Sequence, residues 1–429
     1  MLRALIRSRF GVAAFLPVIP LLFAACGDGE VEGGPVTAYE GAQVIVGDGT
    51  EPIQDAVLLV QDGSLLAVGP RAEIEVPGGA ARVDLTGRTV MPALVNAHMH
   101  TPGGEREALV SFLEHNAYWG VGAITSFGTD SSTASFELRQ EAPLPNAARL
   151  RTAGRGITSP EPGRGEVPYW VTTPEEGRAA VQELAAKPVD IVKIWVDDRN
   201  GQYEKLPPSI YTVVIDEAHN HGLRVAAHIF ALEDAKNLLR AGIDVFAHSV
   251  RDQDIDDEFV QLFLGKPLTV QVPNLPNRGV ATDLSWLAAT FPADRLAELQ
   301  ANAVDNPEQQ EGFGIQARNL ARLSEEGIRI AFGTDGGRPW QTHIELADMV
   351  AAGMSPADVI VAATRNSAAL IGLTDAGTLE AGKTADFIVL EADPLQDITN
   401  TRRIVSFYLR GAEVDRAGIA ARLNPPAVQ

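Results

Sequence analysis

The sequence predicts an α/β chain in which a (β/α)8 TIM barrel is joined to a small β-sandwich domain formed from both chain ends. Eight short runs are rich in Val, Ile and Ala without strict polar alternation, which is typical of buried parallel strands. Segments with helix signals separate these runs. Strand-and-turn patterns of another kind precede and follow them, so the two ends are expected to share one domain.

Both ends of the chain carry short strands with tight turns. In residues 37–90, two apolar runs flank Asp62-Gly63, a dipeptide that strongly favours a β-hairpin. The segments TADFIVLEADP and RIVSFYLRGAEV, within residues 384–415, show the same pattern. We therefore predict that residues 37–90 and 374–420 are the two parts of the β-sandwich domain.

The barrel is predicted over residues 91–373. The candidate strands are 89–96, 121–126, 148–153, 189–195, 223–228, 243–248, 267–272 and 328–333. Thr173, followed by Pro174 and then Glu176, has the signals of a helix start, and Ser355-Pro356 begins a second one. Three glycines stand where helices should end: Gly222, Gly242 and Gly327.

The first 25 residues have the layout of a secretory signal peptide: three arginines, then an apolar stretch too short to span a bilayer. The stretch ends in LFAAC, which resembles a bacterial lipobox except that Phe23 replaces a smaller aliphatic residue. We expect cleavage before Cys26, lipidation of Cys26, and a flexible tether over residues 26–36. The chain would then be exported to the bacterial cell envelope or periplasm and held at a membrane surface. The alternative is an incidental thiol in a cleaved leader.

Composition excludes several classes of protein. The hydrophobic share of 45% allows a sizeable core and argues against global disorder. The formal charge of −21 becomes −24 when the three arginines of residues 1–25 leave, because that segment holds no acid. A basic surface for nucleic acid is therefore not expected. Cys26 is the only cysteine, so the chain cannot form an internal disulfide.

Six residues with metal-ligand chemistry lie at or near the ends of predicted strands, where parallel barrels carry their chemistry. They are His98 and His100 in LVNAHMH, Lys193 in DIVKIWV, His228 in RVAAHIF, His248 in DVFAHSV and Asp335 in RIAFGTD. The first two histidines are two residues apart, so both face the same side of their strand. Imidazoles so placed suit Zn²⁺. Taken singly, each histidine could be a core residue, and the aspartate could cap a helix.

Lys193 is the unusual member of this set. Burying a charged lysine in an apolar strand is costly. One interpretation is that its ammonium group snorkels to solvent at the strand end. The other is that its pKa is lowered and its amine has reacted with CO₂. The resulting carbamate would offer two anionic oxygens as a bridge between two metals.

The ordered set HxH, Lys, His, His and Asp, on barrel strands 1, 4, 5, 6 and 8, resembles the amidohydrolase superfamily in its binuclear subtype with a carboxylated lysine. TVMPALVNAHMH resembles the first-strand signature of that family, and GTLEAGKTADFIVLEADP resembles its return to the β-domain. The resemblance covers about residues 37–415 and is greatest to the prolidase-like and imidazolonepropionase branch. Ala93 and Asn96 replace the usual glycine and aspartate, but neither position is a ligand.

The resemblance implies a role for each of the six residues. His98 and His100 would bind the more buried metal together with Asp335, His228 and His248 would bind a second metal, and carboxylated Lys193 would bridge the two. Two divalent ions, which we expect to be zinc, would lower the pKa of a shared water. The metal-bridged hydroxide would attack a carbonyl, and Asp335 would pass the proton to the leaving nitrogen.

We predict a metal-dependent amidohydrolase that cleaves amide bonds of peptides or N-acyl amino acids. An envelope location disfavours an imidazolonepropionase role. The same hydroxide could open cyclic amides, lactones or phosphotriesters, whereas deaminases of the superfamily typically lack the bridging lysine. The alternative outside enzymes is a surface binding lipoprotein with a vestigial site. A homo-oligomer is left open.

Five further residues are candidate substrate contacts. Tyr169 and Tyr203 flank the fourth strand, Arg251 follows the sixth, Arg338 follows the eighth, and His343 opens the last barrel helix. An arginine could clamp a substrate carboxylate, although an exposed salt bridge is the alternative. The other histidines are expected to be structural: His115, His219 and His221.

Overall fold

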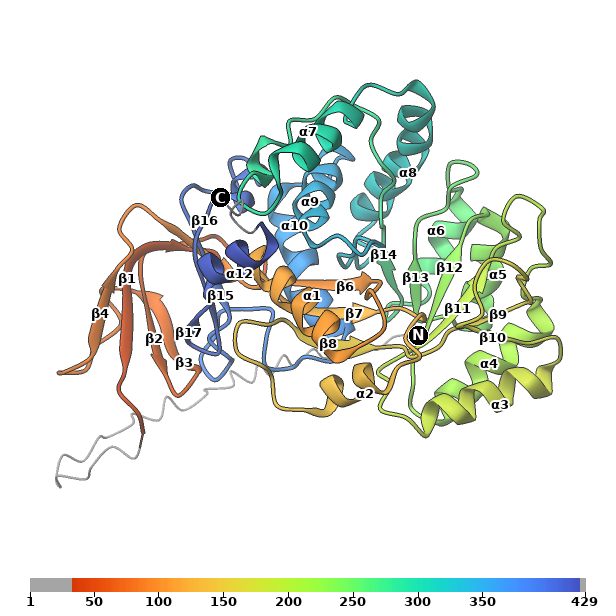
Figure 1. The fold of residues 1–429 in the computed structure, drawn as a ribbon, viewed down its shortest axis with the longest axis horizontal. Coiled ribbons are helices and arrows are strands. Elements are labelled where there is room, and N and C mark those ends of the chain that lie inside the picture. The colour runs from red at the N-terminus through yellow and green to blue at the C-terminus, as the bar shows by residue number, and fades with distance from the viewer. Residues whose placement is uncertain (1–32, 425–429) are drawn as a thin grey trace, which may run out of the picture. The chain divides into compact units, whose positions relative to one another are not determined.

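A closed ring of parallel strands forms the centre of the chain in the computed structural model, which describes residues 33–424 (Figure 1). The predicted signal peptide, residues 1–25, and the predicted lipidation site, Cys26, lie outside the described residues. Residues 35–424 belong to one compact unit. Within residues 33–424, no helix is both long and apolar enough to cross a membrane.

Seven strands and one extended segment close the barrel. The strands are β6 (Leu94–Met99), β7 (Val121–Ser126), β8 (Arg149–Thr152), β11 (Val192–Val196), β12 (Val225–Ile229), β13 (Val245–Ala247) and β14 (Val270–Val272). Their pairings are all parallel, and the Asp190 N–H donates to Thr152 O to join the β8 side to the β11 side. Segment 329–332 bonds to Gln271 of β14 and to Ala97 of β6, so the ring is complete. The predicted barrel is confirmed.

Two predicted strands differ from the observed ones. The run 89–96 divides in two: β5 (Thr89–Pro92) joins the terminal sheet, and β6 starts at Leu94. The division is fixed by the Ala93 N–H, which donates to Asp386 O of the terminal domain. The eighth run, 328–333, is not a regular strand. It forms one isolated bridge, between Ile330 and Gln271, and makes only a few backbone hydrogen bonds to β14 and β6.

Helices cover the outside of the barrel (Figure 1). They are α1 (Arg106–Tyr118), α2 (Thr133–Gln140), α3 (Pro174–Ala185), α4 (Pro208–Asn220), α5 (Leu232–Ala241), α6 (Asp257–Leu264), α7 (Ala293–Asn302), α8 (Pro307–Glu325), α9 (Thr342–Ala351), α10 (Pro356–Val361) and α11 (Ser367–Leu370). Thr173 forms the predicted capping box with Glu176, and Ser355 caps α10. Gly242 ends α5 in the left-handed region, at φ +92°.

Short elements complete the barrel region. They are strands β9 (Ile157–Thr158) and β10 (Tyr169–Trp170), the 3-10 turns η1 (Ser285–Leu287), η2 (Pro339–Gln341) and η4 (Ile398–Arg402), and the π-helical turn η3 (Ala362–Asn366). Small side chains fill the barrel interior, among them Ala97, Ala226, Val245 and Ala331.

The terminal sheet is built from both ends of the chain, as predicted. Its order is β17-β16-β15-β5-β1-β2-β3, with β4 paired to β1. Its remaining strands are β1 (Thr37–Val44), β2 (Ile53–Gln61), β3 (Ser64–Pro70), β4 (Ala81–Asp84), β15 (Phe387–Leu390), β16 (Ile404–Leu409) and β17 (Ala412–Glu413). Asp62 and Gly63 both have positive φ, at +49° and +78°, as a two-residue hairpin turn requires.

The eight strands of this domain form one continuous sheet whose β3 end is bridged to the segment before β15, between Ser64 and Thr384. The inner faces share one core, in which Tyr39, Phe387 and Tyr408 form aromatic contacts. The last helix, α12 (Arg416–Leu423), contacts α1 of the barrel. The residue boundaries that we predicted for the domains stay a prediction.

Candidate active site

Three histidines surround the carboxylate of Asp335 at one end of the barrel. The side chain of Asp335 is 36% exposed, and its Oδ1 lies 3.1 Å from His98 Nε2 and 3.0 Å from His100 Nε2. Its Oδ2 lies 3.5 Å from His248 Nε2. Desolvation would raise the pKa of Asp335, but the charges of His248 and His98 hold it well below its usual range. The carboxylate is therefore an anion that faces three histidine nitrogens.

Local backbone geometry aims these side chains. His98 belongs to β6, His100 follows it, and His248 directly follows β13 with φ +104°. Asp335 follows the eighth barrel segment with φ +53°, and its N–H donates to His98 O. Left-handed backbone at a non-glycine residue is uncommon and concentrates at functional sites. Two such residues, Asp335 and His248, meet here.

His98 is held in one tautomer. Its Nδ1 lies 2.8 Å from Asn274 Oδ1, which can only accept, so Nδ1 carries the proton and Nε2 carries a lone pair in the neutral ring. Burial lowers the pKa of His98 to about 4, so the ring is neutral near pH 7. Nε2 and Asp335 Oδ1 are then two acceptors 3.1 Å apart. Such a contact is favourable when a cation lies close to both atoms.

Lys193 is completely buried, although it is the second residue of β11. Among the residues that the structure describes, its Nζ has no hydrogen-bond partner. The ammonium group faces the rings of Phe127 and Trp195, 5.2 Å and 5.4 Å from their centroids. Burial lowers the pKa of Lys193 to about 7. The snorkelling interpretation is therefore wrong, because the Lys193 side chain does not reach solvent.

The ring of His228 contacts the ring of His248, and their centroids are 4.4 Å apart. His228 Nε2 is 2.9 Å from Asp197 Oδ2 and 2.9 Å from Arg199 Nη1. Burial lowers the pKa of His228 to about 3. The charges of neighbouring cations on this side favour a neutral ring that can accept a bond from Arg199.

A group of three side chains could hold a metal ion within residues 33–424: His98, His248 and Asp335. One ligand atom from each lies within 4.8 Å of the others. Nε2 of His98, Nδ1 of His248 and Nζ of Lys193 are buried without a hydrogen-bond partner among the described residues. Unpaired buried nitrogens are costly, and a divalent cation would satisfy histidine nitrogens of this kind. The residues present therefore fit a metal.

Three residues at this end of the barrel were not identified from the sequence: Asn274, Asp197 and Arg199. Each lies within three residues after a barrel strand, Asn274 after β14 and the other two after β11. Arg199 Nη1 lies 2.6 Å from Asp197 Oδ2, and its Nε lies 3.1 Å from Glu161. A polar residue shortly after a strand was the available signal, but many loop residues share it.

The predicted substrate contacts have different surroundings. Arg251 is near the site: its Nε has no hydrogen-bond partner in the described chain, and burial lowers its pKa while the charges of Asp335 and Asp197 oppose that shift. Arg338 is exposed and lines a cavity together with Thr334. Tyr203 donates its hydroxyl to Pro162 O.

Two of the candidate contacts have structural partners instead. Tyr169 lies under the Arg155 guanidinium, 3.8 Å from its ring centroid, with Lys187 Nζ at 3.5 Å from its hydroxyl. His343 is 1% exposed, with Nδ1 3.0 Å from Thr401 Oγ1 and Nε2 3.1 Å from Trp119 O. The prediction that His343 binds substrate is corrected, because both of its ring nitrogens are engaged in the core.

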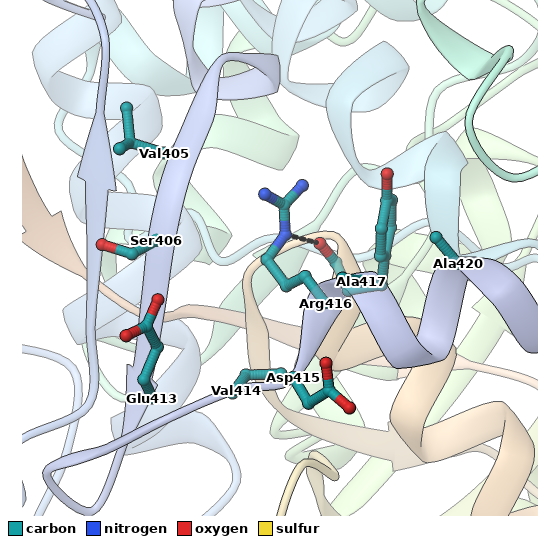
Figure 2. A pocket seen from close by; sticks show the side chains of 9 residues that line it. Val405, Ser406, Glu413, Val414, Asp415, Arg416, Ala417 and Ala420 are labelled. Atoms are coloured by element: carbon teal, nitrogen blue, oxygen red, sulfur yellow. Dashed lines mark hydrogen bonds between the residues drawn. The ribbon is translucent and has the colours of Figure 1, made fainter.

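Two cavities differ in their relation to this site. The larger, about 590 Å³, lies between β16, β17 and α12, where Arg416 Nε donates to Tyr118 O (Figure 2). It contains none of the predicted ligands, and Asp415 on its rim caps α12. The smaller, about 240 Å³, includes Thr334, the neighbour of Asp335. Only the smaller cavity adjoins the histidine cluster.

Comparison with known proteins agrees with this geometry. The model of the amidohydrolase family matches residues 89–414. Imidazolonepropionase from Deinococcus radiodurans is 28% identical over 391 residues, which cover 84% of this chain and 92% of that protein. Ochratoxinase from Aspergillus niger is 25% identical over 426 residues, covering 85% and 82% respectively.

A solved Xaa-Pro dipeptidase with methionine in its active site has a TM-score of 0.70, with 21% identity, over 88% of this chain and 99% of that one. This likeness supports the fold. The predicted class, a hydrolase acting on carbon–nitrogen bonds, is confirmed at the level of the family. The chain belongs to the amidohydrolase family.

Proposed function

We propose that the chain is a binuclear metal hydrolase that cleaves amide bonds of peptides or N-acyl amino acids. The observation that carries this proposal is the buried Nζ of Lys193, which has no partner among the described residues and lies close enough to His98 and His228 to lower their pKa values. A lysine so enclosed is costly to keep charged. Its conversion to an anionic bridge explains why the strand carries it.

Two groups of ligands would hold the metals, which we propose to be zinc. His98, His100 and Asp335 would hold one ion, and His228 and His248 the other, with Lys193 between them. The Asn274 contact leaves His98 Nε2 free to bind. His228 would have to release Asp197 and Arg199 from its Nε2. Divalent ions at such a site polarise a carbonyl and lower the pKa of water.

The change at Lys193 requires only CO₂. The neutral amine attacks the carbon of CO₂, a nitrogen–carbon bond forms, and the amine loses one proton to solvent. A pKa of about 7 leaves a large share of the amine neutral at physiological pH. The product carries one negative charge, which Arg251 nearby and the divalent ions would compensate, because the histidines themselves are neutral.

Asp335 would move the proton in the reaction. Its carboxylate is ionised and lies among the ligand nitrogens, so it can accept a proton from the attacking water. It then donates that proton to the leaving nitrogen, which departs as an amine.

The substrate class rests on the charges at the rim. The charge of Arg251 acts on His228, and its Nε has no partner among the described residues, so a free carboxylate of a peptide or N-acyl amino acid would suit it. Relatives whose names indicate imidazolone, ochratoxin and Xaa-Pro dipeptide substrates support cleavage of a carbon–nitrogen bond.

We further propose that the chain is exported and anchored by lipid at Cys26. The intact mass of the protein from the membrane fraction would test this.

The test combines metal analysis with a substrate library. The zinc-loaded chain is screened against dipeptides, N-acyl amino acids, cyclic amides, lactones and phosphotriesters. We expect two metals per chain and amide hydrolysis as the strongest activity. Preference for lactones or phosphotriesters would replace the proposed substrate class. Absence of turnover in a preparation with two metals would favour a binding protein with a vestigial site.

A further inference from the structure

The cavity of about 240 Å³ beside Asp335 is formed by two loops and two helices. One wall is the chain that follows β14 together with the end of α7, and the other is the chain that follows Asp335 together with α9. These elements lie on one side of the barrel, where α7 and α9 are neighbours in Figure 1. Thr334, the residue before Asp335, lines the cavity, and the charge of Asp335 acts on Glu345 in its wall, so the cavity lies near the carboxylate.

About half of the side chains that line the cavity are apolar, and the others are polar or charged. The apolar ones include Leu275, Leu284, Leu299, Trp340 and Ile344. Trp340 is fixed by edge contacts with Trp286 and Phe291, at centroid distances of 6.4 Å and 6.3 Å. This apolar part of the wall favours an apolar ligand group through burial of its surface.

The two acids in the wall are not available to a charged ligand. Glu345 is 5% exposed and accepts a hydrogen bond from the Leu275 N–H at 2.9 Å. Asp348 is 4% exposed and lies 3.5 Å from Arg278 Nε. Burial raises the pKa of both carboxyl groups, so Glu345 tends toward its neutral form. A cationic ligand group would therefore find no free anion in the wall, whereas Arg338 is an exposed cation that also lines the cavity.

Arg251 lies on the other side of the site. It follows β13, and its charge acts on His228, whereas the cavity follows β14 and Asp335. In an N-acyl amino acid, the carboxylate and the acyl group lie on opposite sides of the scissile bond. A substrate whose carboxylate contacts Arg251 therefore directs its acyl group toward the cavity.

We propose that this cavity is the acyl-group pocket and that it selects amides with a bulky, mainly apolar acyl group, either aromatic or branched aliphatic. The inference rests on the proposed function, because it assigns one half of the same substrate. It makes Ala303, at the end of α7, and Ile344, on α9, determinants of specificity. Neither residue belongs to the predicted metal ligands.

The test compares two substrates that share one amino acid and differ in the acyl group: acetyl and 4-phenylbutanoyl. Ala303→Phe fills the cavity from one wall, and Ile344→Ala enlarges it from the other. We expect Ala303→Phe to lower kcat/KM for the phenylbutanoyl substrate at least tenfold and for the acetyl substrate less than twofold. Ile344→Ala should move the preference toward still larger acyl groups.

Ala420→Phe is the matched control, since it places the same side chain in the remote cavity of Figure 2. It should leave kcat/KM for both substrates unchanged, and all three variants should keep the metal content of the parent. If Ala303→Phe lowers kcat/KM equally for both substrates, or for neither, the acyl-pocket assignment is overturned. Failure of the parent chain to hydrolyse both amides instead overturns the proposed function, so the two failures are distinguishable.

Discussion

Asn274 Oδ1 accepts a hydrogen bond from His98 Nδ1 over 2.8 Å, which joins the first strand of the barrel to the loop after the seventh. Asn274 adopts the left-handed conformation, at φ +46°, which asparagine tolerates better than most residues. Its side chain is buried, so water does not compete for the bond. This contact fixes both the direction and the tautomer of the imidazole.

Asn274→Ala is expected to lower metal affinity about 10- to 100-fold, because His98 loses the acceptor that keeps its proton on Nδ1. Asn274→Asp is the matched control, since a carboxylate oxygen also accepts that bond. It should retain most of the affinity. Competition with a chelator of known affinity measures both variants, and circular dichroism checks the fold. Unchanged affinity in Asn274→Ala contradicts the orienting role.

Lys193 variants separate folding from metal binding. Lys193→Met should fold at least as well as the parent, because an apolar chain of similar length fits between Phe127 and Trp195. Both Lys193→Met and Lys193→Ala should lose most of the bound metal and most of the activity, since no bridging anion can form. Metal analysis and turnover measure the two losses.

A small carboxylate distinguishes these two variants. Lys193→Ala leaves a space that acetate or propionate could enter, so activity should return in part when the carboxylate and zinc are added. Lys193→Met fills that space and should not respond. Full metal content and full activity in either variant would refute the bridging role of Lys193.

Asp335→Asn tests the proton transfer. Asparagine tolerates the left-handed backbone at φ +53° and keeps an oxygen toward the histidines, so the fold should persist. An amide cannot carry the proton, and kcat should fall at least about 100-fold. Asp415→Asn, at the cap of α12 far from the histidines, is the control and should keep its activity. A kcat within tenfold of the parent in Asp335→Asn argues for another proton carrier.

The barrel could be predicted from the sequence because its signals are local. Hydrophobic runs, the Thr173 capping box and Gly242 each depend on a few neighbouring residues, and all three appear in the structure. The division of the run 89–96 depends on a distant partner, Asp386, which bonds to Ala93. Such a partner leaves no mark in the run itself, so the boundary between the two sheets could not be predicted.

The candidate site shows the same distinction. His98 and Lys193 stand out because their side chains are unusual in apolar strands. Asn274 is an ordinary loop residue in the sequence, and only the closed barrel brings it to His98. His343 was misplaced for the opposite reason: it is near Asp335 in sequence, but Trp119 and Thr401 hold its ring in the core. Neighbourhood in sequence did not give the direction of the side chain.

Glu345 predicts a pH dependence of stability rather than of catalysis. Burial raises its pKa well above the ordinary value, with the charges of Asp348 and Asp335 adding to the shift and the Leu275 N–H opposing it. The neutral acid is therefore favoured in the folded chain. Between the unfolded pKa and the folded pKa, the native state binds more protons, so the free energy of unfolding decreases as pH rises.

Glu345→Gln keeps an oxygen that accepts the Leu275 N–H but cannot ionise. Its free energy of unfolding should therefore fall less steeply than that of the parent between pH 5 and pH 8. Asp348, whose pKa burial raises to about 6, contributes a decrease of the same sign in both proteins. Urea denaturation at several pH values compares the two slopes.

Glu345→Leu is the contrasting variant, because it removes the acceptor as well as the charge. The Leu275 N–H would then be buried without a partner, which costs about 1–3 kcal/mol at every pH. Parallel pH profiles for the parent and Glu345→Gln would show that Glu345 does not retain its proton in the folded chain. In that case its carboxylate would be ionised, and the acyl pocket would carry a free negative charge next to Asp348.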